Sequence, residues 1–192
     1  MHCASLRVYV PWLQPRDIFL AFVLYESHDS TMAVLTIVVG EDAPILRKKT
    51  EEIPRVTKEI LRLIKDMQET VKSAEGAGLA APQIGKSLRL CLAMINGKHI
   101  PLINPEITWR SEKTTDMEEG CLSLPGVWLK INRPFAITIS YLDTKGNEQE
   151  RKLEGFESHV VQHEIDHLEG VLIVDYPNGT AENPVHTAES VL

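Results

Sequence analysis

Three histidines spaced four residues apart near the end of the chain constrain its fold more than any other feature. They are His159, His163 and His167, and the last two bound the run HEIDH at residues 163–167. Residues i and i+4 of an α-helix lie on one face, so a helix would place all three imidazoles in a single stripe. The spacing therefore predicts a helix over about residues 156–169, with three histidines on one side.

This stripe has the layout of a hydrolytic metal site. Two imidazoles at i and i+4 can share one metal ion, and a carboxylate beside the first of them, Glu164, can act as a base. Geometry alone leaves open which two histidines bind. The position of Glu164 favours His163 and His167, with His159 as a pocket or packing residue. The alternative is a pair of ordinary surface histidines on an amphipathic helix, because such motifs also arise by chance.

A catalytic metal of this type needs a third protein ligand and one open coordination position. His186 lies in a polar tail, and no other histidine or glutamate after the helix is placed to supply that ligand. Cys121 is the available soft ligand, and it lies upstream in the segment EGCLSLP at residues 119–125. A thiolate there would neutralise one unit of the metal's charge and would make the site sensitive to oxidation.

The composition excludes several classes of protein. The chain has 192 residues, which fits one domain, and 43% of them are hydrophobic, enough for a core that needs no disulfide. A net charge of −7 without a basic stripe argues against nucleic-acid binding. The cysteines, Cys3, Cys91 and Cys121, form no disulfide framework and suit a reducing compartment. No apolar run approaches the roughly 18 residues of a transmembrane helix.

The two ends of the chain differ from its middle. Residues 1–31 are expected to be an N-terminal extension, either disordered or the product of an alternative start ahead of Met32. They fit neither a secretory signal nor a transit peptide well, so organellar targeting is disfavoured but stays open. Residues 177–192 are polar and are expected to form a flexible tail. A single domain is then expected over residues 32–176.

Hydrophobic patterns predict the elements of this domain. An amphipathic helix is expected from near Pro54 to Gly76, since apolar residues recur there at helical spacing. Residues 76–83 follow, rich in small side chains that let a ligand approach the backbone. Residues 33–39 are rich in β-forming residues. Strands are expected at residues 88–95, 99–102, 135–142 and 148–153, the last two joined as a hairpin.

Three of these segments, taken together, resemble peptide deformylase. They are residues 76–83, 119–125 and 162–170, which occur in the order and spacing of that family. The similarity extends from about Met32 to about Tyr176. It implies an α+β fold with antiparallel β-sheets around a central metal-binding helix. It also implies a hydrolase that removes the formyl group from the N-terminal formylmethionine of newly synthesised proteins and releases formate.

The resemblance also implies a role for each matching residue. Glu164 would be the general acid and base. Gln83 and the backbone N–H of Leu122 would stabilise the oxyanion. The metal ligands would be Cys121, His163 and His167. The substrate-binding residues would be Gly78, through its backbone, and Ala77, Phe156, His159 and Val160 around the methionine side chain. Glu119, Asp166 and Arg133 are expected to form a buried charge network near the metal, although Arg133 could instead be a solvated charge.

The resemblance further implies a cofactor and partners. The cofactor would be one divalent metal ion, Fe(II) in the cell, with Zn(II), Ni(II) or Co(II) also able to occupy the site. The substrates would be N-formylmethionyl nascent peptides in the cytoplasm, with transient contact to the ribosome. No contact with membrane or nucleic acid is expected. The tail at residues 177–192 lacks basic residues and an apolar stripe, so ribosome docking through it is not expected.

Two other functions remain open at this point. A zinc endopeptidase would cleave internal peptide bonds and would take its third ligand from after the helix. A structural metal site would need four protein ligands and would leave Glu164 without a task. The endopeptidase alternative explains neither the segment at 119–125 nor the small residues at 76–83.

Overall fold

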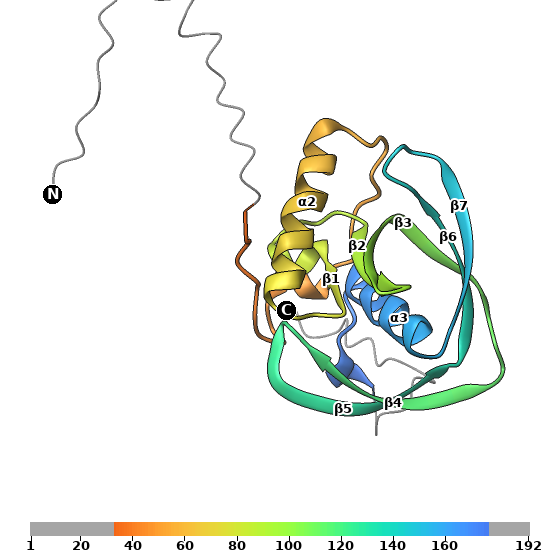
Figure 1. Cartoon of the computed structure of the whole chain (residues 1–192). Helices are drawn as coiled ribbons and strands as arrows, with labels where there is room; N and C mark the ends of the chain where they lie inside the picture. The colour runs from red at the N-terminus through yellow and green to blue at the C-terminus, as the bar shows by residue number, and fades with distance from the viewer. Residues whose placement is uncertain (1–32, 177–192) are drawn as a thin grey trace, which may run out of the picture. The chain divides into compact units, whose positions relative to one another are not determined.

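Two antiparallel sheets enclose a central helix in the part of the chain that the structure describes, residues 33–176 of a computed structural model (Figure 1). The expectations for residues 1–31 and 177–192 fall outside this part. The expected α+β class, with antiparallel sheets around the histidine-bearing helix, is confirmed. The elements are η1 Pro44–Arg47, α2 Lys58–Ser73, β1 Gly78–Ala80, η2 Ala81–Ile84, β2 Leu90–Ile95, β3 Lys98–Arg110, β4 Thr114–Cys121, β5 Leu124–Pro134, β6 Ala136–Leu142, β7 Glu148–Glu154, α3 Gly155–Glu169 and η3 Ile173–Asp175.

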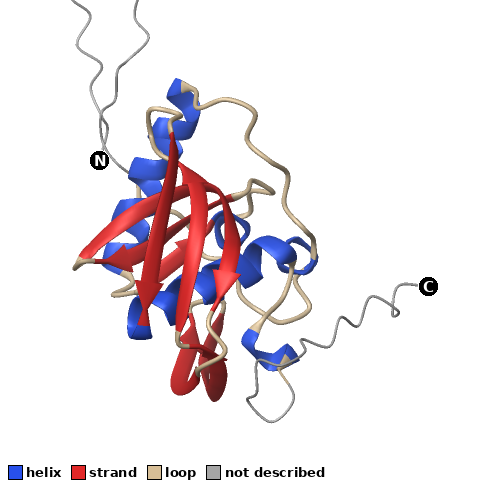
Figure 2. Ribbon diagram, turned by 90° about the vertical axis from the view of Figure 1, so that its right-hand side faces the viewer, coloured by secondary structure: helices blue, strands red, loops and turns tan. Residues whose placement is uncertain are grey.

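The larger sheet has the strand order β1-β2-β3-β6-β7. The expected hairpin joins β6 to β7, and its turn is closed by Asp143, which accepts hydrogen bonds from the backbone N–H groups of Lys145 and Asn147 at 2.8 and 2.9 Å. Seen from the side of β6 and β7, this sheet covers α3 (Figure 2). The strand β3, Lys98–Arg110, is much longer than the expected 99–102. Its second half is more polar and pairs with β6, so the sequence there shows no apolar run that would have predicted a strand.

A second sheet, the β4–β5 hairpin, was not predicted. The exposed positions of β4 carry polar or charged residues, whereas β5 has Pro125 and Gly126 near its start and exposes Trp128, so neither strand shows a clear apolar pattern. The register pairs Glu119 with Leu129 and Gly120 with Trp128, and a tight turn then brings Cys121 opposite Leu124. Cys121 therefore lies at the tip of a hairpin that contacts α3 through β5.

The helix α2 begins later than expected. The prediction placed its start near Pro54, but the N-cap is Thr57, whose side-chain oxygen accepts a hydrogen bond from the backbone N–H of Ile60 at 3.4 Å. Its apolar face packs as expected, since Ile64 and Met67 are buried in one cluster with residues of β1 and β2.

The segment at residues 33–39, rich in β-forming residues, forms no strand. Its backbone N–H groups bond elsewhere: that of Leu35 to Thr70 Oγ1 at 2.8 Å, and that of Val38 to the carbonyl of Gln83 at 2.8 Å. These two bonds run to α2 and η2 and not to a neighbouring strand. β-forming composition alone does not supply a partner strand.

The helix α3 confirms the expected range and lies inside the molecule. Gly170 ends it in the left-handed conformation, with φ of 80°. His159 and His167 are each only 1% exposed, so the stripe of histidines faces the interior. This burial rules out the alternative of ordinary surface histidines.

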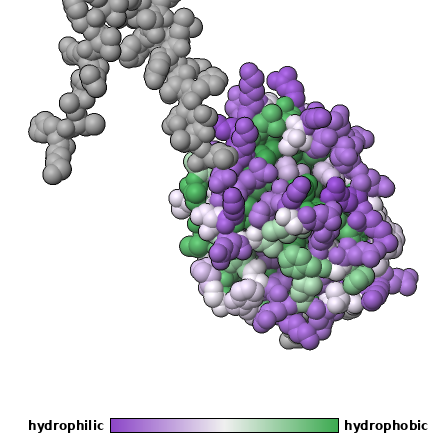
Figure 3. All heavy atoms as spheres, in the orientation of Figure 1, coloured by the Kyte–Doolittle hydropathy of each residue, from purple (hydrophilic) through white to green (hydrophobic). Residues whose placement is uncertain are grey.

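The outer surface has the opposite character. The face in Figure 3 is mostly polar, with smaller hydrophobic patches between polar groups. Among the described residues, no helix combines the length and the apolar character needed to span a membrane.

Candidate metal centre

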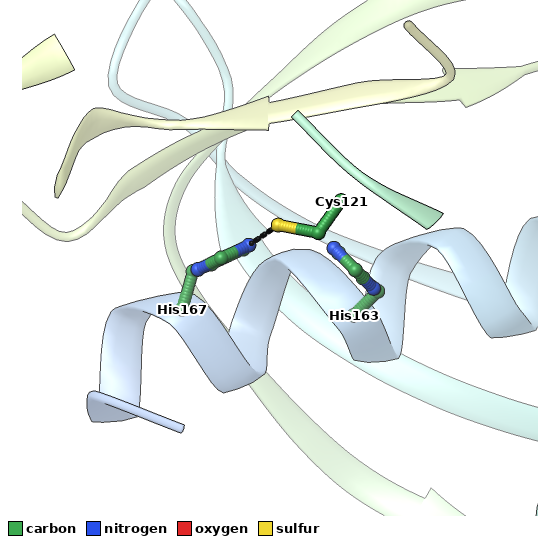
Figure 4. Close-up of side chains that lie close together, drawn as sticks. All are labelled: Cys121, His163 and His167. Atoms are coloured by element: carbon green, nitrogen blue, oxygen red, sulfur yellow. Dashed lines mark hydrogen bonds between the residues drawn. The ribbon is translucent and has the colours of Figure 1, made fainter. Parts of the chain in front are cut away.

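Cys121, His163 and His167 converge at one point, although they come from β4 and α3. One ligand atom from each lies within 4.8 Å of the others, and Cys121 Sγ is 3.2 Å from His167 Nε2 (Figure 4). Metal bonds of about 2.3 Å to sulfur and 2.1 Å to nitrogen allow two atoms at this separation to reach one ion. The donor set, one thiolate and two imidazoles, fits a divalent transition metal with an open position.

The ring of His163 is aimed at this cluster by a carboxylate behind it. His163 Nδ1 lies 3.0 Å from Glu119 Oε2. A carboxylate oxygen accepts, so Nδ1 carries the proton and Nε2 presents its lone pair to the cluster. His167 differs, because its buried Nδ1 has no hydrogen-bond partner among the described residues.

Glu119 is the centre of a buried polar network. Arg133 donates to it twice, from Nε to Oε1 at 2.6 Å and from Nη2 to Oε2 at 3.0 Å. His159 Nδ1 lies 3.1 Å from Oε1. Burial alone would raise the pKa of Glu119, but the hydrogen bonds from His159, His163 and Arg133 hold that pKa well below its ordinary range. Glu119 is therefore a carboxylate that accepts four hydrogen bonds.

The expected network of Glu119, Arg133 and Asp166 is present, and Tyr176 belongs to it too. Arg133 Nη1 donates to Asp166 Oδ2 at 2.7 Å, and with 2% of its surface exposed Arg133 is not a solvated charge. The hydroxyl of Tyr176 donates to Asp166 Oδ2 at 2.6 Å and accepts from Arg133 at 3.1 Å. Tyr176 was not predicted, because its partners are distant in sequence and no motif includes it.

Glu164 lies buried beside the cluster, and one of its carboxylate oxygens accepts no hydrogen bond from the described residues. The residue is 3% exposed, and the oxygen without a partner is Oε2. Burial, reinforced by the charges of Glu119 and Asp166, raises the pKa of Glu164 to about 7. A carboxyl group with this pKa can both accept and release a proton near neutral pH.

Gly78 allows the backbone of β1 to approach Glu164. A Cβ at this position would overlap Glu164 Oε1 and the carbons next to it. The small residues noted in the sequence are thus needed here for a close contact inside the protein, in addition to any contact with a ligand.

Gln83 has its side-chain amide held in one orientation. Its Oε1 accepts from the backbone N–H of Ala80 at 2.8 Å, and its Nε2 donates to Ser123 Oγ at 3.2 Å and lies 3.7 Å from Cys121 Sγ. The NH₂ group therefore faces the ligand cluster. Ser123 was not predicted, although its place two residues after Cys121 could have suggested it.

A cavity of about 590 Å³ opens beside these groups. Its wall contains Cys121, His163, Glu164, Gln83 and Leu122, together with all five expected substrate-binding residues, Ala77, Gly78, Phe156, His159 and Val160. Phe156 is 51% exposed, so a large part of its surface still meets solvent. The other wall residues include Met117, Val127 and Trp128, which the sequence did not indicate because the β4–β5 hairpin was not predicted.

Comparisons with known proteins all point to one family. The family described as Polypeptide deformylase matches residues 34–183. A peptide deformylase of Pseudothermotoga lettingae is 46% identical over 132 residues, which cover 69% of this chain and 77% of that protein. One of Desulforudis audaxviator is 42% identical over 145 residues, covering 75% of this chain and 94% of that protein.

Solved structures give the same result. The crystal structure of a peptide deformylase from Thermotoga maritima matches with a TM-score of 0.72 and 39% identity, covering 75% of this chain and 99% of that one. The peptide deformylase of Ehrlichia chaffeensis in complex with actinonin matches with a TM-score of 0.72 and 37% identity, covering 76% of this chain and 90% of that one.

Proposed function

The chain belongs to the polypeptide deformylase family, and from this premise we propose how its own residues divide the work of the reaction. It is a metal-dependent hydrolase that removes the formyl group from the N-terminal methionine of newly made peptides and releases formate. The observation that carries the proposal is the convergence of Cys121, His163 and His167 beside the buried carboxylate of Glu164.

One divalent ion would be held by Cys121 Sγ and by the imidazoles of His163 and His167. When bound, the ion supplies Lewis acidity, which polarises the formyl carbonyl and makes water a better nucleophile at neutral pH. We propose Fe(II) as the ion in the cell, with Zn(II), Ni(II) and Co(II) as the alternatives. A thiolate with two imidazoles can bind any of these ions. The geometry of the site and the availability of each metal therefore help to decide which ion is bound.

Glu164 would move the protons. Its carboxylate takes a proton from the attacking water and later gives one to the leaving amine nitrogen. The unpartnered Oε2 and the pKa of about 7 support both steps.

Gln83 and the backbone N–H of Leu122 would stabilise the charge that grows on the formyl oxygen. The fixed amide of Gln83 supports this role, because a donor already aimed at the cluster needs no reorganisation. Gly78 would present its backbone to the peptide. Ala77, Phe156, His159 and Val160 would surround the methionine side chain, in line with their place in the cavity wall.

The setting of the reaction is also a proposal. The catalytic domain would comprise residues 32–176, in line with the family match over 34–183. The protein would act in the cytoplasm on nascent chains, with transient contact to the ribosome. Two free buried cysteines, Cys91 and Cys121, suit that reducing compartment.

The deciding experiment compares formate release from formyl-Met-Ala-Ser by the wild-type protein and by Glu164→Ala. We expect the variant to keep its metal and to lose activity by at least about 10²-fold, as removal of a general acid-base group does. A zinc endopeptidase would instead cleave internal bonds of longer peptides. If Glu164→Ala released formate at the wild-type rate, the assigned role of Glu164 would be wrong.

A further inference from the structure

His159 makes a contact that a pocket wall does not require. Its Nδ1 lies 3.1 Å from Glu119 Oε1, while His163 Nδ1 lies 3.0 Å from the other oxygen, Oε2. Both histidines are on α3, one turn apart. The carboxylate of Glu119 therefore forms two hydrogen bonds with α3, one through each of its oxygens.

Arg133 holds the same carboxylate from β5, through Nε at 2.6 Å and Nη2 at 3.0 Å. Arg133 reaches α3 only through Asp166, to which its Nη1 donates at 2.7 Å, so its tie between Glu119 and α3 is indirect. The position of Oε2 relative to α3 decides how the ring of His163 is turned, and His159 supplies a second tie between Glu119 and that helix.

We infer that His159 is a positioning residue for the metal ligand His163, acting through Glu119. The inference rests on the proposed function, in which His163 binds the metal, and it adds a task to the expected place of His159 in the methionine pocket.

The other nitrogen of His159 supports this role. A carboxylate accepts, so the proton of His159 is on Nδ1. Its Nε2 is buried and has no hydrogen-bond partner among the described residues, and the side chain is 1% exposed. Nε2 is thus closed off from a ligand in the cavity. A hydrocarbon side chain would line the same wall without a buried unsatisfied nitrogen, so the polar contribution of this residue is its bond to Glu119.

Two amide substitutions separate the ring nitrogens. In His159→Asn the amide nitrogen occupies about the place of Nδ1 and can still donate to Glu119. In His159→Gln it lies nearer the place of Nε2 and cannot. Metal affinity is measured by competition with a chelator, using Zn(II) as the probe. We expect about a tenfold or greater loss in His159→Gln, the usual effect of removing a partner behind a metal ligand, and an affinity near wild type in His159→Asn.

A second readout is the KM for formyl-Met-Ala-Ser of each fully loaded variant. If His159 positions His163, the His159→Asn variant keeps wild-type metal affinity even if the smaller asparagine side chain raises KM. Equal metal affinities in the wild type and both variants, with KM alone changed, would overturn the inference and leave a pocket residue. Equal losses in Asn and Gln would overturn it too. Far-UV circular dichroism of the metal-free proteins confirms that both variants fold.

The proposed function is tested separately by the wild type. If the loaded wild-type protein released no formate, the deformylase function would fail. The Zn(II) affinities of the variants would still decide whether His159 positions His163.

Discussion

At the scale of single residues, Gly78 is the position where one methyl group should matter most. The Cβ of Gly78→Ala would overlap Glu164 Oε1, so the carboxylate or β1 must shift. Displacing a catalytic group by about 1 Å can cost about 10²-fold in rate, and we expect a loss in kcat of that order. Steady-state kinetics with formyl-Met-Ala-Ser measure the effect.

The metal content of Gly78→Ala serves as the control, since the substitution touches none of the three proposed ligands. A variant with normal metal content and wild-type kcat would show that Glu164 does not need its present position.

Glu119 links stability to pH. Its folded pKa lies below the ordinary 4.5, so the stability it contributes is fully present above pH 4.5 and is lost as the pH falls toward the folded value. Removing one partner of a buried pair costs about 3–5 kcal/mol, because the charge on Arg133 is left uncompensated. We therefore expect Glu119→Gln to be less stable by about that amount at pH 7, and the difference to shrink at pH 3.

Urea unfolding of the metal-free protein at both pH values checks this prediction and keeps metal binding out of the comparison. An equal difference in the free energy of unfolding at pH 7 and pH 3 would mean that the Glu119 charge is not the source of the stability.

The sequence identified residues unevenly. Cys121, His163 and His167 were found because two of them share a helical spacing and the third lies in a motif of a known family. Ser123 and Tyr176 were not found, because each acts through a contact that only the folded chain creates.

At the scale of secondary-structure elements, the elements with a clear period were predicted well. The helix α3 and the β6–β7 hairpin appear where expected, since their apolar spacing and turn residues agree with their tertiary packing. The β4–β5 hairpin was missed because its strands expose alternating polar side chains and bury few apolar ones. The segment at 33–39 shows the converse, β-forming residues without a neighbouring strand.

The N-cap of α2 offers a test that is separate from the active site. Thr57→Ala removes the side-chain acceptor for the backbone N–H of Ile60 and should lower the free energy of unfolding by about 1 kcal/mol. Thr57→Ser keeps a hydroxyl acceptor and is the matched control. Thermal unfolding measures both.

Formate release by Thr57→Ala at 25 °C should equal that of the wild type, since α2 supplies no ligand or catalytic group. An activity loss larger than the loss of folded protein would show that α2 takes part in the site.

At the scale of the whole molecule, the site depends on parts that are distant in sequence. The region of β1 and η2 supplies Gly78 and Gln83, the tip of β4 supplies Cys121, and α3 supplies both histidines and Glu164. A family resemblance could name these residues and part of the cavity wall, but not the part of the wall that belongs to the unpredicted β4–β5 hairpin.

The same arrangement separates catalysis from folding. Three hydrophobic clusters form the core of the described residues, and Val161 and Leu168 of α3 pack in one of them with residues of β2 and β6. The metal should therefore be needed for activity more than for the fold, in contrast to a structural site with four protein ligands.

The most direct test of the central claim is formate release before metal removal, after chelation and after return of the metal under anaerobic conditions. We expect chelation to abolish formate release, Fe(II) or Co(II) to restore it, and circular dichroism to show that the fold is retained throughout. Formate release that survives complete metal removal, or unfolding of the domain when the metal leaves, would contradict it.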